Sequence, residues 1–141
     1  KYIKPGLTEQ QIRAELENYM LSNGADALSF DSIIASGPNG ANPHAQPGER
    51  VVQTGDMIVM DYGAGYLDYH SDMTRTVVVG APSEEQQHVF DVVRKANETC
   101  AAAIHAGVTG SDIHNLFRLT NQLLYNKQVT KMFQVDSADK I

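Results

Sequence analysis

The chain has few or none of the features that would indicate several common classes of protein. It contains one cysteine, Cys100, so it forms no internal disulfide, and we expect this thiol to be a small buried residue of a helix. No apolar run approaches the roughly 20 residues needed to cross a bilayer, so we expect no membrane partner. The net charge is −6 and no stripe of Lys and Arg occurs, which argues against a nucleic-acid partner. We expect no signal peptide, and we expect a cytoplasmic location by default.

Local patterns predict separate helices and strands. Thr8 and Ser83 are each followed three residues later by a glutamine, which is the spacing of a capping box at a helix start. The second of these helices is predicted to run to about Ala106, and a third to begin from a cap at Ser111. Residues 29–36 are predicted to form a strand. With 141 residues, of which 42% are hydrophobic, the chain is predicted to be one α+β domain or part of one.

Two strand-like runs each contain an aspartate. Asp61 lies near the end of the first run, Asp72 begins the second, and glycines suited to a tight reversal lie between them. A turn centred on Tyr66 and Leu67 would place the two aspartates directly opposite each other, with their β-carbons about 5 Å apart. Two facing carboxylates repel each other, and divalent cations prefer oxygen ligands, so the pattern predicts a metal site. The alternative is a pair of exposed carboxylates on a hairpin.

Two histidines and the residues beside Asp72 are further candidates for a role at this site. His44 lies in a loop over residues 37–50 that is rich in Gly, Pro and Asn, where it is either solvent-exposed or functional. Strand alternation places Thr74 on the face of Asp72 and Arg75 on the opposite face. We expect Arg75 to anchor the hairpin to a helix, and we expect His70, which lies beside Asp72, to have a structural role.

Three sequence blocks, residues 34–44, 55–64 and 69–76, occur in an order that resembles one known family. This is the Xaa-Pro dipeptidase and aminopeptidase P branch of the pita-bread metallopeptidases. The resemblance implies that residues 1–116 are the N-terminal half of the catalytic domain, a curved antiparallel sheet covered by helices. Residues 117–141 would continue the last helix into a tail of unclear alignment.

The resemblance also implies roles for individual residues. Asp61 matches the first metal-ligand aspartate, Asp72 matches the aspartate that bridges two metal ions, and His44 matches an active-site histidine outside the metal shell. The complete enzyme would use two divalent ions of the Mn or Co class to hydrolyse the bond before proline. One histidine and two glutamates of that ligand set have no counterpart here. We therefore expect this chain, taken alone, to bind metal weakly or not at all and to be inactive.

The implied partner is a peptide with proline at its second position. A different reading is a non-catalytic pita-bread-like module that binds peptides or proteins. Because half of a domain leaves part of its core uncovered, pairing of two chains into a homodimer is a further hypothesis.

Overall fold

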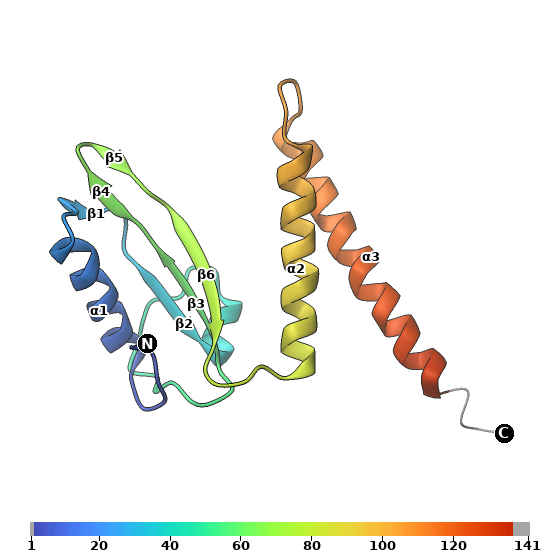
Figure 1. Ribbon diagram of the computed structural model, residues 1–141, viewed down its shortest axis with the longest axis horizontal. Helices are drawn as coiled ribbons and strands as arrows, with labels where there is room; N and C mark the ends of the chain where they lie inside the picture. Colours follow the sequence, from blue (N-terminus) through green and yellow to red (C-terminus); the bar gives the residue numbers. More distant parts are fainter. Residues whose placement is uncertain (1, 137–141) are drawn as a thin grey trace. The chain divides into compact units, whose positions relative to one another are not determined.

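The computed structural model describes the backbone of residues 2–136 and the side chains of residues 2–123. It divides into two compact units between Pro82 and Ser83. The first unit contains one α-helix and all the strands, and the second contains two long helices (Figure 1). Of the predicted tail, residues 137–141 lie outside the described part of the chain. Within the described residues, no helix has both the length and the apolar character that a membrane span requires.

The first unit is built from two three-stranded antiparallel sheets and their connections. The sheet orders are β1-β4-β5 and β2-β3-β6. The predicted strand over residues 29–36 is too long, because only its last four residues pair with β3. The elements in chain order are α1 (Glu9–Ser22), β1 (Ala27–Leu28), β2 (Ile33–Ser36), the 3-10 helix η1 (Gly37–Ala41), β3 (Met57–Tyr62), β4 (Ala64–Tyr66), β5 (Tyr69–His70) and β6 (Met73–Val78).

Helix α1 starts as predicted and covers one face of the β2-β3-β6 sheet. The Thr8 hydroxyl accepts from the Gln11 N–H and the Gln11 side chain accepts from the Thr8 N–H, so the capping box is confirmed. Ile12 of α1 is buried in one cluster with Ile34 of β2 and Ile58 of β3. Full burial of an isoleucine side chain stabilises the fold by about 1.5–3 kcal/mol. This cluster therefore fixes α1 against the sheet.

The two faces of the sheet have different neighbours. Ile34 and Ile58 point toward α1. Because side chains alternate along a strand, the residues next to them in β2 and β3 point the other way. We call this second side the aspartate face, since Asp61 occupies one of its positions. Its members, read from the pairing of the strands, are Ile33, Ala35, Met57, Val59, Asp61, Thr74, Thr76 and Val78.

The second unit is a pair of helices, α2 (Glu84–Ala103) and α3 (Gly110–Asp136). The capping box at Ser83 is confirmed, but α2 ends at Ala103, three residues before the predicted end. The cap predicted at Ser111 is wrong. Thr109 takes that place, because its hydroxyl accepts from the Asp112 N–H while the Asp112 carboxylate accepts from the Thr109 N–H.

Cys100 packs inside this helix pair. It is buried on the face of α2 that also buries Val92 and Ala96, at a spacing of four residues. Its thiol lies 3.8 Å from the carbonyl oxygen of Ile113 in α3. The prediction of a small buried helical residue is confirmed.

Candidate functional site

The hairpin that carries the aspartates forms, but in a different register from the predicted one. In the β3–β6 pair, Asp61 lies opposite Thr74, so the prediction that Asp61 lies directly opposite Asp72 is wrong. The reason is the position of the turn. Leu67 and Asp68 have φ values of 48° and 63°, the left-handed pair of a two-residue hairpin turn. The turn is thus centred one residue later than predicted, which moves every partner by two residues.

A shift of two residues preserves the face on which a side chain lies. The ladder continues past β6, since the Ser71 N–H donates to the Ala64 carbonyl at 3.0 Å. By count, Asp72 then comes opposite Gly63, two residues before Thr74. Asp72 is therefore the diagonal neighbour of Asp61, at a typical spacing of about 7–8 Å between such positions.

Gly63 allows the two chain segments to come close at this point. A β-carbon at this position would lie 1.9 Å from the Ser71 carbonyl oxygen and 2.8 Å from the Ser29 β-carbon. Since the first of these atoms belongs to the backbone, no side-chain movement would relieve the clash. The sequence indicated glycines only for the turn, and it gave no sign that Gly63 is required for close approach beside Asp72.

The charge of the aspartate pair is largely uncompensated by the protein. Asp61 is half-buried and accepts one hydrogen bond, from the Thr74 hydroxyl at 3.0 Å. Asp72 is exposed, and among the described side chains neither aspartate forms an ion pair. Arg75 lies on the face opposite Thr74, as predicted, and its guanidinium donates to the Thr74 carbonyl oxygen. The two carboxylates are thus open to an external cation.

Two carboxylates are too few to make a complete metal site by themselves. Within residues 2–123, no group of three or more His, Cys, Asp or Glu side chains is arranged to hold a metal ion. A divalent ion bound by two carboxylates alone would take most of its ligands from water.

His44 lies in an exposed loop, as predicted, and its N–H donates to the Asn42 side chain at 3.0 Å. No polar contact joins its imidazole to the aspartates in the described part of the chain. The loop nevertheless starts beside the aspartate face. A β-carbon on Gly40 of η1 would lie 3.6 Å from a methyl group of Val59, which belongs to that face.

His70 has a local partner instead of a place in the aspartate pair. Its Nδ1 lies 3.2 Å from the Ser29 hydroxyl, next to the close approach at Gly63. This contact supports the structural role predicted for His70.

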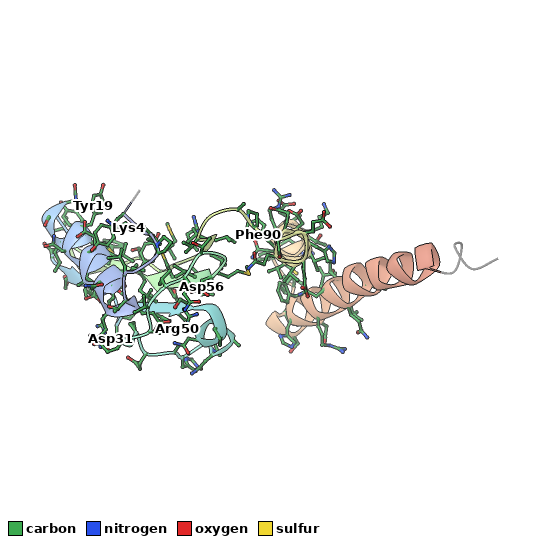
Figure 2. All side chains as sticks on the ribbon, turned by 90° about the horizontal axis from the view of Figure 1, so that it is seen from below. Lys4, Tyr19, Asp31, Arg50, Asp56 and Phe90 are labelled. Carbon is green, nitrogen blue, oxygen red and sulfur yellow. The ribbon has the colours of Figure 1, made fainter. Side chains whose placement is uncertain are left out.

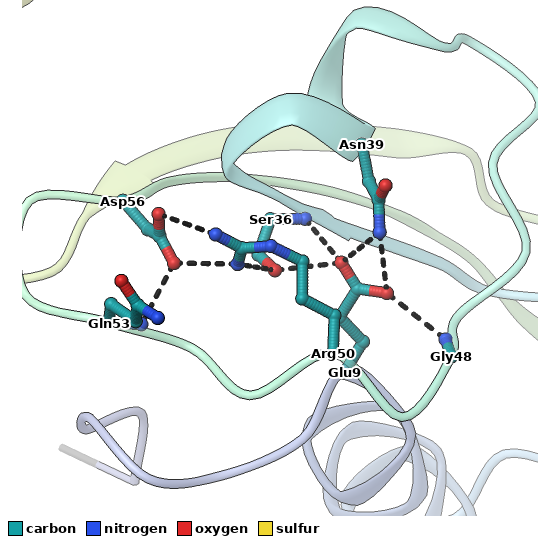
Figure 3. Close-up of polar contacts among 7 residues, drawn as sticks. All are labelled: Glu9, Ser36, Asn39, Gly48, Arg50, Gln53 and Asp56. Carbon is teal, nitrogen blue, oxygen red and sulfur yellow. Dashed lines mark hydrogen bonds and ion pairs between the residues drawn. The ribbon is translucent and has the colours of Figure 1, made fainter.

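A second polar cluster, which no local sequence pattern indicated, lies where α1 meets the end of β2 (Figure 3). Its centre is Glu9, which is fully buried. Arg50 joins the cluster to Asp56 through two hydrogen bonds of 2.7 and 3.0 Å, and Figure 2 shows these two labelled residues close together. We call the cluster the Glu9 network. Its members are Glu9, Ser36, Asn39, Gly48, Arg50, Gln53 and Asp56.

Hydrogen bonds keep both carboxylates of the network ionised. Burial by itself would raise the pKa of Glu9, but donors on Ser36, Gly48 and Asn39 outweigh burial, and the pKa lies below its ordinary value. Hydrogen bonding to Arg50 lowers the pKa of Asp56 in the same way. Arg50 in turn has a raised pKa, chiefly through its hydrogen bond to Asp56.

Comparison with known sequences places these residues in a family context. The model of metallopeptidase family M24 matches residues 1–129. The uncharacterized peptidase YqhT of Bacillus subtilis is 42% identical over 117 residues, which cover 83% of this chain and 33% of that protein. The Xaa-Pro dipeptidase of Pyrococcus furiosus is 38% identical over 116 residues, which cover 82% of this chain and 33% of that protein. The chain thus spans about a third of the length of these relatives.

Solved structures agree with the sequence comparison. The X-Pro aminopeptidase of Thermotoga maritima matches with a TM-score of 0.83 and 41% identity, over 85% of this chain and 34% of that protein. Aminopeptidase PepP of Pseudomonas aeruginosa matches with a TM-score of 0.84 and 28% identity, over 90% of this chain and 29% of that protein. The predicted α+β pita-bread fold and the predicted resemblance to the Xaa-Pro branch are both confirmed.

Proposed function

The chain belongs to metallopeptidase family M24, and from this premise we propose that it forms part of a dinuclear-metal peptidase that hydrolyses the bond before proline. The substrates in this proposal are Xaa-Pro dipeptides or peptides with proline at the second position. Asp61 and Asp72 supply carboxylate ligands, and His44 acts on the substrate. The observation that carries the proposal is the pair of diagonal, uncompensated aspartates on one hairpin. The names of the relatives, an Xaa-Pro dipeptidase and an X-Pro aminopeptidase, support the choice of substrate.

The donor set suits divalent ions of the Mn or Co class, as one part of a larger set. Carboxylate oxygens are ligands that Mn²⁺ accepts readily. Asp61 uses one lone pair for the Thr74 hydroxyl, and its other acceptor positions stay free. When bound, such ions polarise a peptide carbonyl and lower the pKa of a water molecule.

The protein side chains have separate tasks in this proposal. Thr74 holds the Asp61 carboxylate in one orientation through its hydroxyl. Asp72 is placed by the close approach at Gly63, which allows no larger residue. The imidazole of His44, on an exposed loop, donates a hydrogen bond to the carbonyl oxygen as negative charge develops there.

Isothermal titration with Mn²⁺ tests the assignment of the ligands. We expect weak binding to the wild-type chain and its loss in Asp61→Asn and in Asp72→Asn. Asp68→Asn is the matched control, because Asp68 lies in the turn of the same hairpin and asparagine tolerates its φ of 63°. Equal binding by all four proteins would refute the assignment. Nanomolar affinity in the wild type would show that additional ligands complete the site.

A non-catalytic peptide-binding module is the second candidate function. Binding of a labelled Xaa-Pro peptide, measured with Mn²⁺ and again with a chelator, separates the two functions. A peptide-binding module would bind equally in both conditions and would be unaffected by Asp61→Asn, whereas the peptidase site requires the metal and the aspartate.

A further inference from the structure

The segment that carries His44 is tied to α1 at both of its ends. It leaves the sheet after Ser36 and reaches the start of α1 at Gly48. At the first end, the Ser36 N–H and the Ser36 hydroxyl each donate to Oε1 of Glu9 at 2.7 Å. At the second end, the Gly48 N–H donates to Oε2 of Glu9 at 3.0 Å. One buried carboxylate therefore joins two points of the chain that are twelve residues apart.

A third contact comes from within the segment. The Asn39 amide of η1 donates to Oε1 of Glu9 at 3.0 Å and to Oε2 at 3.2 Å. All the groups around the Glu9 carboxylate are donors, which only an ionised, acceptor-only side chain can satisfy together. Arg50 completes the arrangement by donating to the Ser36 hydroxyl at 2.6 Å, so this hydroxyl links the positive charge of Arg50 to the Glu9 carboxylate (Figure 3).

Backbone groups of α1 also hold the chain at the second end of this segment. The first N–H groups of a helix have no partner inside the helix. Here the Glu9 N–H donates to the Arg50 carbonyl oxygen and the Gln10 N–H donates to the Gly48 carbonyl oxygen, both at 3.2 Å. Gly48 thus both donates to the helix start and accepts from it.

This attachment controls where the segment passes. Asn39 reaches Glu9 on the α1 side of the sheet, and its neighbour Gly40 lies next to Val59 on the aspartate face. Segment 37–48 therefore passes around the end of β2 from one face to the other. His44 follows within four residues of Gly40, so the path of the segment sets the position of the imidazole.

We propose that Glu9 is a positioning residue for His44: its carboxylate fixes the path of segment 37–48 past the aspartate face. The link to catalysis rests on the proposed function, in which His44 acts on the substrate. The attachment itself depends only on the contacts of Glu9 with Ser36, Asn39 and Gly48.

Glu9→Gln tests the proposal with a change of similar size. A glutamine has one acceptor oxygen, and facing it toward Ser36 keeps both of those hydrogen bonds. Its NH₂ group then meets the Gly48 N–H, donor against donor. Amide hydrogen exchange followed by NMR should show Gly48 exchanging about tenfold faster, as expected for loss of a hydrogen bond to a charged acceptor, with Ser36 nearly unchanged. Glu15→Gln, an exposed change on the same helix, should leave both amides as in the wild type.

A second readout reports the position of His44 itself. Mn²⁺ bound at the aspartates broadens the NMR signals of nearby nuclei with a steep dependence on distance. We expect the His44 ring signals to be broadened in the wild type and in Glu15→Gln, and to be broadened less in Glu9→Gln at equal metal occupancy. If no broadening occurs in any protein, the proposed metal site fails, and the exchange rate of Gly48 still decides whether Glu9 holds the segment.

A second variant covers the case in which Glu9→Gln unfolds the chain. Asn39→Ala removes only the contact from η1 and leaves Ser36 and Gly48 bound to Glu9. It should accelerate exchange within residues 37–48 and leave the Ile58 amide of β3 protected. Unchanged exchange at Gly48 in Glu9→Gln, or unchanged exchange throughout the segment in Asn39→Ala, would overturn the proposal.

Discussion

Glu9 and the aspartates of the hairpin are carboxylates in opposite surroundings. Glu9 is fully buried, and donors on Ser36, Asn39 and Gly48 surround both of its oxygens. Asp61 is half-buried with one donor, and Asp72 is exposed with none among the described residues. The two regions lie at different places on one small unit, on the α1 side of the sheet and on its aspartate face.

The contrast shows how the number of donors decides what a carboxylate can do. A carboxylate whose lone pairs are all occupied by protein donors is a structural group, because it has no acceptor left for a ligand. A carboxylate with few donors keeps its charge available, and a second one nearby makes a cation favourable. The Glu9 network therefore stabilises the path of the chain, while the aspartate pair is suited to bind a cation.

The largest loss of stability is expected at Gly63, where the backbone leaves no room for a side chain beside Asp72. Gly63→Ala would place a β-carbon 1.9 Å from the Ser71 carbonyl oxygen, so the strands must separate. We expect the free energy of unfolding in urea to fall by about 3 kcal/mol. Mn²⁺ binding should be lost as well, because Asp72 moves with Ser71.

Gly65→Ala is the matched control for this change. A β-carbon on Gly65 would meet the Ala27 carbonyl oxygen and the His70 ring at 3.5 Å, which is ordinary contact. We expect its free energy of unfolding to stay within about 1 kcal/mol of the wild type. If both alanine variants were equally stable, close approach at Gly63 would not be what places Asp72.

The next-largest loss of stability is expected in the Glu9 network. Arg50→Ala leaves Asp56, whose side chain is 13% exposed, without its cation. We expect a loss of about 2 kcal/mol in the free energy of unfolding, less than for a fully buried pair because Arg50 is partly exposed. Arg94→Ala is the control, since Arg94 and Asp91 are 61% and 49% exposed, and it should cost at most about 0.5 kcal/mol. Similar losses in the two variants would contradict the special role of the network.

The sequence predicted the local elements better than the long-range contacts. Thr8 and Ser83 identified two helix starts because a capping box involves only residues three positions apart. The predicted register of the hairpin was wrong by two residues, because the two glycines between Asp61 and Asp72 lie outside the turn. Leu67 and Asp68, both with left-handed backbone angles, form the turn and set the register.

The Glu9 network could not be predicted from local patterns. Its central contacts join Glu9 to Ser36 and Gly48, which are 27 and 39 residues away. In the sequence Glu9 is one acidic residue in the first turn of a helix, where it is also favoured by the helix dipole. Asp61 and Asp72 were predicted from the expected hairpin, and the resemblance to the family added His44; their roles as ligands and catalyst stay predictions.

The pH dependence of stability should distinguish the two regions. The pKa values of Glu9 and Asp56 are lowered in the folded chain, so their contribution to stability is fully present above the ordinary carboxyl range, about 4. That contribution is lost as the pH falls through the lowered values. We expect the Tm measured by circular dichroism to fall as the pH is lowered from about 5 to about 3, and to fall less in Glu9→Gln. An equal slope in that variant would mean that other carboxylates cause the acid sensitivity.

The smallest effect on stability is expected at the aspartate pair. In Asp61→Asn the side-chain oxygen still accepts from the Thr74 hydroxyl, and one of two neighbouring negative charges is removed. We expect the free energy of unfolding without metal to stay within about 0.5 kcal/mol of the wild type. Added Mn²⁺ should raise the Tm of the wild type and not that of the variant, because only a ligand that binds the folded state stabilises it. A large loss of stability without metal would mean that Asp61 belongs to the framework of the sheet, and the division between structural and binding carboxylates would then fail.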